Sequence, residues 1–204
     1  MLTFLMEELS NYKTFVKDTI RNYYQVTSTS IDLLLAIAKV QHIQKGDTLL
    51  PFGKIAQQVS ILYKGTIVSN FLNEDGKEYH KNIFLKGDFV SSTVSCLTQK
   101  PSQFSLEAIE DSILISFNYH QYRKLIDTTN DFKNFYIAYL EKNWVIDKEQ
   151  RETTIVLKEA SERYLSFIEK YPNIEKRIPL LYIASHLGIT ATQLSRIRKK
   201  IQEN

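Results

Sequence analysis

The chain has 204 residues, of which 43% are hydrophobic and 24% are charged, as is usual for a folded globular protein with a substantial core. Its net charge is only +3, which excludes a uniformly basic or acidic protein, but Arg196, Arg198, Lys199 and Lys200 form a local basic cluster. A single cysteine, Cys96, excludes an internal disulfide and is too little for a zinc or iron–sulfur centre.

The sequence predicts a cytoplasmic protein without a membrane segment. Its longest apolar runs, such as Leu33 to Ile37, are far too short to span a bilayer. Glu7 and Glu8 follow the first apolar residues, which is unlike a secretory signal. One unpaired cysteine fits a reducing compartment.

The first forty residues are expected to form two helices. Apolar residues recur at helical spacing in Met1–Tyr23 and in Ile31–Val40. Ser30 is the expected N-cap of the second helix, because a serine hydroxyl accepts from the free amides of a first turn.

A β-rich region follows. Five of the six glycines lie between residues 46 and 87, separated by short runs of β-branched and aromatic residues, which indicates an antiparallel sandwich or barrel. The predicted strands are Thr48–Pro51, Val59–Tyr63, Thr66–Leu72, Tyr79–Leu85, Phe104–Ile109 and Ser112–Asn118. The predicted turns are Lys45-Gly46-Asp47, Asp75-Gly76, Lys86-Gly87-Asp88 and Glu110-Asp111.

Helices return after the last predicted strand. A short one is expected at His120–Ile126, and the stretch from Asp131 to Tyr171, which has no Gly or Pro, predicts amphipathic helices. Asp147–Thr154 has almost no apolar residues, which indicates either a solvated stretch or a break between two helices. Tyr171-Pro172-Asn173 predicts a firm stop.

The C-terminus has the pattern of a helix-turn-helix that begins at Leu180. The small Ala184 stands at the fifth position, where the helices touch, and Gly188 stands at the ninth, where the turn needs positive φ. Pro179 suits the helix start and Thr190 can cap the second helix. Apolar residues fill the expected packing positions: Ile183, Leu187, Ile189, Leu194 and Ile197.

The exposed face of the second helix predicts binding to double-stranded DNA. Its hydroxyl, amide and guanidinium groups suit phosphates and base edges. The alternative is that the basic end only complements the helix dipole. The predicted DNA-contacting residues are Thr190, Thr192, Gln193, Ser195, Arg196, Lys199 and Lys200.

These motifs together resemble the Crp/Fnr family of bacterial transcription regulators, the family of the cyclic-AMP receptor protein. The resemblance covers residues 30 to 201, and the C-terminal end is similar to Bacteroidetes-type members. The motifs that carry it are Lys45-Gly46-Asp47, Pro51-Phe52-Gly53, Leu62-Tyr63-Lys64-Gly65, Glu74-Asp75-Gly76-Lys77, Lys86-Gly87-Asp88 and the helix-turn-helix.

The resemblance implies an α+β fold in three parts. These are a cyclic-nucleotide-binding-type antiparallel β-roll with flanking helices (1–128), a long dimerisation helix (129–156) and a winged-helix, helix-turn-helix domain (157–204). It implies a homodimer joined through the long helix, with RNA polymerase as a further partner. The stretch Phe132–Trp144 would then pack against its twofold mate, or its aromatics cover the chain's own β-roll, and both can hold for different residues.

The sequence departs from members that bind cyclic AMP. Those carry Gly-Glu-Leu and, about a dozen residues later, an arginine that pairs with the cyclic phosphate. Here the opening is Gly87-Asp88-Phe89, Ser102 stands in place of the arginine, and Phe104 adds bulk. We therefore expect no response to cyclic AMP, and either an unknown small-molecule effector or none.

A pocket is nevertheless expected in this part of the β-roll. Its candidate residues are Asp88, Ser91, Ser92, Ser102, Gln103 and Phe104. The alternative is that Ser91, Ser92 and Thr93 are only caps of a short helix. The recognition helix also departs from many members, which have Arg-Glu where this chain has Ala191 and Thr192, so a different DNA site is expected.

No constellation indicates an enzyme, a metal site or a cofactor. The four histidines lack metal-ligand spacing, and no phosphate-binding loop or nucleophile motif is present. The alternative function is a small-molecule-binding β-roll module whose helical tail mediates protein–protein contacts. Arg196 and its basic neighbours favour DNA over an apolar protein interface.

Overall fold

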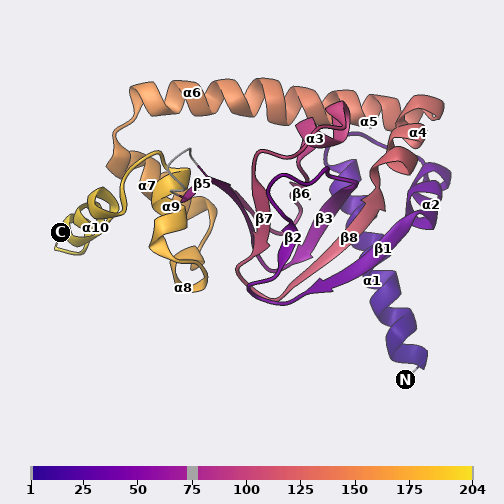
Figure 1. Ribbon diagram of the computed structural model, residues 1–204, viewed down its shortest axis with the longest axis horizontal. Helices are drawn as coiled ribbons and strands as arrows, with labels where there is room; N and C mark the ends of the chain where they lie inside the picture. The colour runs from indigo at the N-terminus through magenta and orange to yellow at the C-terminus, as the bar shows by residue number, and fades with distance from the viewer. Residues whose placement is uncertain (1, 73–77, 204) are drawn as a thin grey trace.

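Two four-stranded antiparallel sheets form the middle of the computed structural model, which describes residues 2–72 and 78–203 (Figure 1). One sheet has the order β1-β8-β3-β6 and the other β2-β7-β4-β5. The strands are β1 (Ala38–Ile43), β2 (Thr48–Leu50), β3 (Gln58–Lys64), β4 (Ile67–Leu72), β5 (Glu78–Phe84), β6 (Phe89–Val90), β7 (Ser105–Ala108) and β8 (Ser112–Asn118). All six predicted strands are confirmed, whereas β1 and β6 were not predicted. The predicted Asp75-Gly76 turn lies outside the described residues.

The predicted second helix is wrong at both ends. Helix α2 spans Ser28–Ala36, and Thr27 is its N-cap, accepting from the Ser30 amide at 3.3 Å. Val40 lies in β1, where Ala38–Ile43 pair with β8 from Phe117 back to Ser112. Pairing with β8, which is distant in the sequence, therefore overrides the helical spacing.

Two matching turns carry the chain between the sheets. Gly46 and Gly87 have φ of +92° and +94°, which glycine adopts without a steric penalty. The carboxylate of Asp47 accepts from the Gln44 amide at 3.0 Å, and that of Asp88 accepts from the Leu85 amide at 2.7 Å. The first turn joins β1 to β2 and the second joins β5 to β6, so each moves the chain from one sheet to the other.

Helices cover the outer face of the sheet that contains β3 and β8. These are α1 (Leu2–Arg21), α2, α4 (Tyr119–Thr128) and α5 (Asn130–Leu140). Their apolar core includes Tyr12, Val16, Ile20, Leu34, Phe117, Phe132 and Phe135. Phe132 and Phe135 are fully buried in it, so the predicted contact with a twofold mate is wrong for these two residues. A second core lies between the sheets and is built on Leu62, Ile67, Val90, Leu106, Ala108 and Leu114.

One long rod of helix runs along the top of the molecule in Figure 1. It consists of α5, the π-helical turn η1 (Glu141–Ile146) and α6 (Asp147–Leu157). Of the two alternatives for residues 147–154, the solvated stretch is correct, because these residues continue the helix. The rod ends at Lys158, whose extended backbone turns the chain into the next helix.

The chain ends in a group of four helices beside the β-roll. They are α7 (Ala160–Lys170), α8 (Ile174–Arg177), α9 (Leu180–His186) and α10 (Ala191–Gln202). Their shared core is built on Tyr164, Phe167, Ile174, Ile178, Ile183 and Leu194, and it is continuous with Val68 and Ile109 of the β-roll. Among the described residues, no helix is long and apolar enough to cross a membrane.

Candidate nucleic-acid interface and β-roll cavity

Helices α9 and α10 and the turn between them lie where the sequence predicts a helix-turn-helix. Ile183, Ala184 and Leu194 have no exposed surface, so the two helices meet over small and apolar side chains. Gly188 has a φ of +69° and its amide donates to the Ser185 carbonyl at 3.1 Å, which ends α9.

Thr190 and Gln193 form a capping box at the start of α10. The Gln193 amide donates to the Thr190 hydroxyl at 3.1 Å, and the Gln193 side-chain carbonyl accepts from the Thr190 amide at 2.9 Å. Both side chains are exposed, but their polar atoms satisfy free amides of the first turn. The sequence predicted the cap at Thr190. It missed the reciprocal hydrogen bond, in which the Gln193 side chain accepts from the Thr190 amide.

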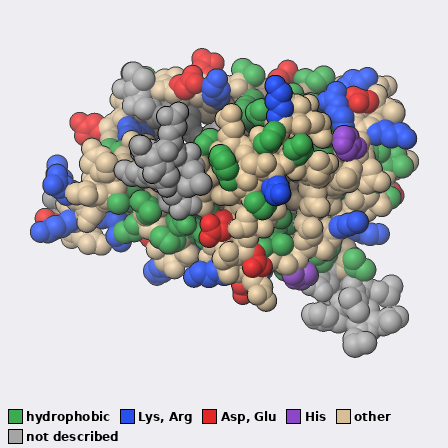
Figure 2. All heavy atoms as spheres, viewed as in Figure 1, with side chains coloured by type: hydrophobic (Ala, Val, Ile, Leu, Met, Phe, Trp, Pro, Cys, Tyr) green, Lys and Arg blue, Asp and Glu red, His purple; other side chains and the backbone are tan. Residues whose placement is uncertain are grey.

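The outward face of α10 carries the remaining predicted DNA-contacting residues. All five have exposed side chains: Thr192, Ser195, Arg196, Lys199 and Lys200. Figure 2 shows Lys and Arg side chains at the end of the molecule where α10 lies. Lys199 Nζ lies 3.7 Å from Glu203 Oε1. Both side chains are exposed, so this ion pair is weak and the Lys199 ammonium can still interact with another anion.

Arg198 belongs to the predicted basic cluster, but it points inward. Its Nε lies 2.7 Å from Glu175 Oε1, and the Tyr164 hydroxyl donates to the same oxygen at 2.6 Å. Burial, together with the bond to Glu175, raises the pKa of Tyr164 to about 12. These contacts fasten the back of α10 to α7 and α8, and sequence reasoning had no signal for the pairing.

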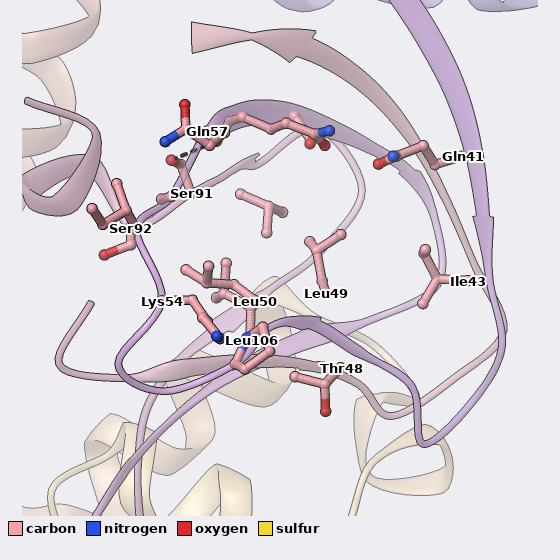
Figure 3. A pocket seen from close by; sticks show the side chains of 16 residues that line it. Gln41, Ile43, Thr48, Leu49, Leu50, Lys54, Gln57, Ser91, Ser92 and Leu106 are labelled. Carbon is pink, nitrogen blue, oxygen red and sulfur yellow. Dashed lines mark hydrogen bonds between the residues drawn. The ribbon is translucent and has the colours of Figure 1, made fainter. Parts of the chain in front are cut away.

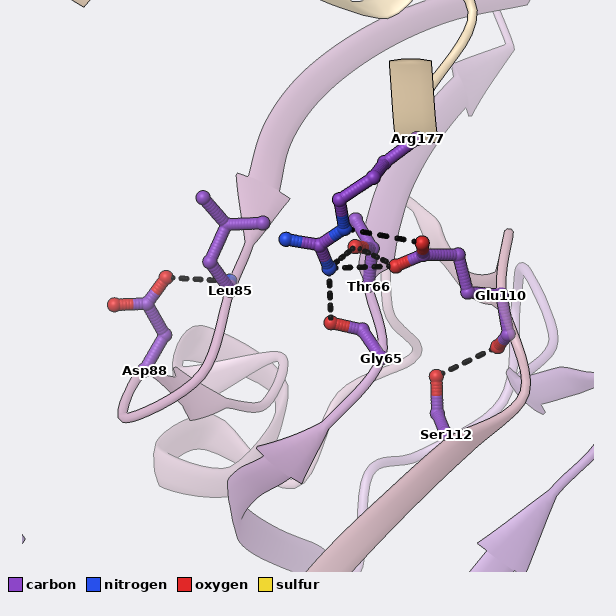
Figure 4. A network of polar contacts seen from close by, with 7 residues as sticks. All are labelled: Gly65, Thr66, Leu85, Asp88, Glu110, Ser112 and Arg177. Atoms are coloured by element: carbon purple, nitrogen blue, oxygen red, sulfur yellow. Dashed lines mark hydrogen bonds and ion pairs between the residues drawn. The ribbon is translucent and has the colours of Figure 1, made fainter. Parts of the chain in front are cut away.

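A second ion pair joins α8 to the β-roll (Figure 4). Arg177 Nη2 lies 2.8 Å from Glu110 Oε2, and Arg177 Nε donates to Glu110 Oε1 at 3.2 Å. Thr66 also donates to this carboxylate. Burial alone would raise the pKa of Glu110, but the bonds from Arg177 and Thr66 outweigh it and hold the pKa below its ordinary value.

The β-roll contains a cavity of about 410 Å³ (Figure 3). Of the predicted pocket residues, Ser91 and Ser92 line it, and Asp88, Ser102, Gln103 and Phe104 do not. The Asp88 carboxylate is used in its own turn, as Figure 4 shows. Phe104 packs against Phe71, with ring centroids 5.3 Å apart.

Ser102 lies directly behind the cavity wall. Its side chain is buried, and its Oγ lies 2.9 Å from Ser92 Oγ and 2.7 Å from the Phe104 carbonyl oxygen. Ser92 stands at the N-cap position of α3 (Thr93–Thr98) but makes no side-chain cap, so the predicted capping role is wrong for this residue. Ser91 donates to the Gln58 carbonyl at 3.0 Å.

The cavity lining is half apolar and half polar. The apolar part is Ile43, Leu49, Leu50, Pro51, Ile55, Ala56, Val90 and Leu106. The polar part is Gln41, Thr48, Lys54, Gln57, Gln58, Ser60, Ser91 and Ser92. Most of these residues were not predicted, because they come from β1, β2, β3 and the connection between β2 and β3, which lie together only in the folded β-roll. Within the described residues, no group of three His, Cys, Asp or Glu side chains could hold a metal ion.

Residues 40–129, which include most of the β-roll, match the model of the cyclic nucleotide-binding domain. A comparison with curated protein sequences finds no match. Among solved structures, the c-di-GMP-responsive global regulator CLP of Xanthomonas campestris is similar at 14% identity and a TM-score of 0.64, covering 87% of this chain and 92% of that one.

Two further structures are similar over most of their length. The catabolite activator protein of Thermus thermophilus has 17% identity and a TM-score of 0.54, with 89% of this chain and 86% of that one covered. A protein of Eubacterium rectale, described as a regulator of the Crp/Fnr family, has 21% identity and a TM-score of 0.62, with coverage of 89% and 88%. The structural neighbours thus include Crp/Fnr regulators, and at these identities the likeness establishes the fold alone.

Proposed function

We propose that this chain is a sequence-specific, DNA-binding transcription regulator of the Crp/Fnr family. The observation that carries the proposal is the outward face of α10, where Arg196, Lys199 and Lys200 lie exposed beside two hydroxyl side chains. This face belongs to a helix whose first turn is capped and whose opposite side is bonded to α8. An α-helix fits into the major groove of DNA. The likeness to Crp/Fnr regulators supports the same function.

Selection of bound sequences from random DNA duplexes tests this proposal. Arg196→Ala is expected to weaken binding to the selected duplex by roughly 1–3 kcal/mol and to relax preference at one base per half-site. Lys200→Ala is expected to weaken binding to all duplexes alike and to flatten the salt dependence. Full affinity and selectivity in the Arg196 variant would remove its assigned role, and failure to enrich any sequence would remove the function.

A protein-binding helical tail is the alternative. A docking helix of that kind needs a row of exposed large apolar residues. On α10 the side chains of Leu194 and Ile197 are turned toward α9 and its core, and Ile201 alone among the large apolar residues of this helix is exposed, which is not a row. The polar face therefore favours DNA.

We further propose a homodimer joined along the long helix. Ile137, Trp144 and Val145 lie on this helix with 48%, 50% and 59% of their surface exposed. Large apolar side chains exposed along one helix are typical of an interface. A twofold dimer would bind a near-palindromic site whose half-sites lie one helical turn apart, about 34 Å.

The proposed regulator does not respond to cyclic AMP or cyclic GMP. A buried cyclic phosphate needs a paired cation, and the position of the expected arginine holds Ser102, whose hydroxyl is bonded within the wall. We expect no saturable heat in calorimetry at micromolar nucleotide, with DNA binding by the same sample as the control. A dissociation constant below about 10 μM would contradict the proposal.

A further inference from the structure

A hydrogen-bonded chain of three polar side chains has both of its end residues, Gln41 and Ser60, in the lining of the β-roll cavity. Ser116 donates to Gln41 Oε1 at 2.8 Å, and Ser60 and Ser116 hydroxyl oxygens lie 2.8 Å apart. Because Ser116 has one hydroxyl hydrogen and gives it to Gln41, Ser60 must be the donor to Ser116. Ser60 Oγ is then an acceptor, and the Gln41 amide nitrogen is a donor, on two residues that line the cavity.

The cavity has almost no charge. Lys54 is the one charged residue among the sixteen that line it, all of them described, and its side chain is exposed. An exposed ammonium interacts weakly with an anion because water screens it. The interior offers hydroxyl and amide groups among aliphatic side chains, as Figure 3 shows for Gln41, Ser91 and Leu50.

We infer that this cavity binds an uncharged small molecule through a group that both donates and accepts hydrogen bonds, as a primary amide does. Such a group satisfies Ser60 and Gln41 together, whereas a carboxylate or phosphate offers no donor and would be buried without a paired cation. The volume of about 410 Å³ lies within the range of pockets that hold small ligands. The assignment of this cavity as an effector site rests on the proposed function, whereas the binding of such a molecule to the cavity does not.

Two pairs of nearly isosteric probes separate charge from shape. Benzamide and benzoate, and nicotinamide and nicotinate, differ in the amide and carboxylate alone. In a two-dimensional amide NMR titration of the full chain to about 10 mM, we expect both amides to give saturable shifts at residues of β1, β3 and β6, because probes of this size reach only millimolar affinity. We expect each carboxylate to bind at least ten times more weakly.

Two variants locate the site. Ile55 lines the cavity with 40% of its surface exposed, so Ile55→Trp is expected to fold and to abolish the shifts. Leu97→Trp is the matched control, because Leu97 is 53% exposed on α3 and does not line the cavity.

Three results would overturn the inference. These are carboxylates that bind as tightly as the amides, amides that give no saturable shift, and amide shifts that persist in Ile55→Trp. Each is distinguishable from failure of the proposed function, because selection of DNA duplexes uses no probe and tests α10 alone.

Discussion

Glu110 accepts hydrogen bonds from Arg177 and Thr66 at the turn between β7 and β8. Its pKa lies below the ordinary value of 4.5, so the folded protein binds this proton less tightly than the unfolded chain does. The contribution of the carboxylate to stability is therefore present above about pH 4.5 and is lost as the pH falls through the lowered pKa.

Glu110→Gln is expected to lower the free energy of unfolding by about 0.5–1 kcal/mol at pH 7, because the pair is partly exposed and screened. The difference from the unsubstituted protein should shrink as the pH falls below about 4. Urea unfolding across this pH range measures it. Glu152→Gln is the control, since Glu152 is exposed and lies 3.8 Å from Lys148; equal effects of the two substitutions would contradict the assignment.

Single residues also show what local sequence can predict. The matching turns at Gly46 and Gly87 were predicted, because positive φ and an Asp that accepts from the residue three positions earlier are local requirements. The resemblance to the Crp/Fnr family placed Asp88 in the pocket, which is wrong because its own turn uses the carboxylate. The partner of Arg177 lies sixty-seven residues away, and no local pattern encodes such a distance.

At the scale of elements, the long helix combines two faces. Phe132 and Phe135 face the β-roll, whereas Ile137 and Trp144 face outward. The π-helical turn η1 has more residues per turn than an α-helix. It therefore changes which residues after Leu140 lie on the same side of the helix as Phe132 and Phe135. Sequence spacing predicted the helix well, but it could not separate the two faces, because both are aromatic and apolar.

Trp144→Glu is expected to convert the proposed dimer to monomers at micromolar concentration, since a charge would be buried at the interface. Sedimentation equilibrium measures the change. Leu33→Glu is the matched control, because Leu33 is likewise about half exposed, at 46%, but belongs to α2 and not to the long helix. A monomeric unsubstituted protein, with or without DNA, would remove the dimer.

At the scale of the whole molecule, the helical C-terminal region is docked on the β-roll. Val68 and Ile109 share one apolar core with Ile174 and Ile178, and the Arg177–Glu110 pair lies at the edge of this contact. Within the helical region itself, the Arg163 guanidinium donates to the carbonyls of Lys158 and Leu187 at 2.7 and 3.2 Å and joins α7 to the end of α9. The composition and order of the parts could be predicted from the sequence, but this docking could not, because it depends on contacts between distant segments.

Arg177→Gln is expected to raise the rate of cleavage after Lys158 by a lysine-specific protease about two- to fivefold. The substitution removes a pair worth about 0.5–1 kcal/mol and lets the helical region open more often. Mass spectrometry of the fragment ending at Lys158 measures the rate. The control is Arg123→Gln, whose partner Asp127 lies in the same helix; identical rates in both variants would show that Arg177 does not hold the contact.

The docked arrangement also has a consequence for the thermodynamics of the proposed binding to DNA. Arg198, Glu175 and Arg177 connect the back of α10, through α8, to the β-roll. If α10 enters the major groove as proposed, its orientational freedom was already lost when the chain folded, and little remains to be lost on the duplex. Such preorganisation favours a small entropic penalty on binding and a slow dissociation rate, which the protein would retain even when its cavity holds no ligand.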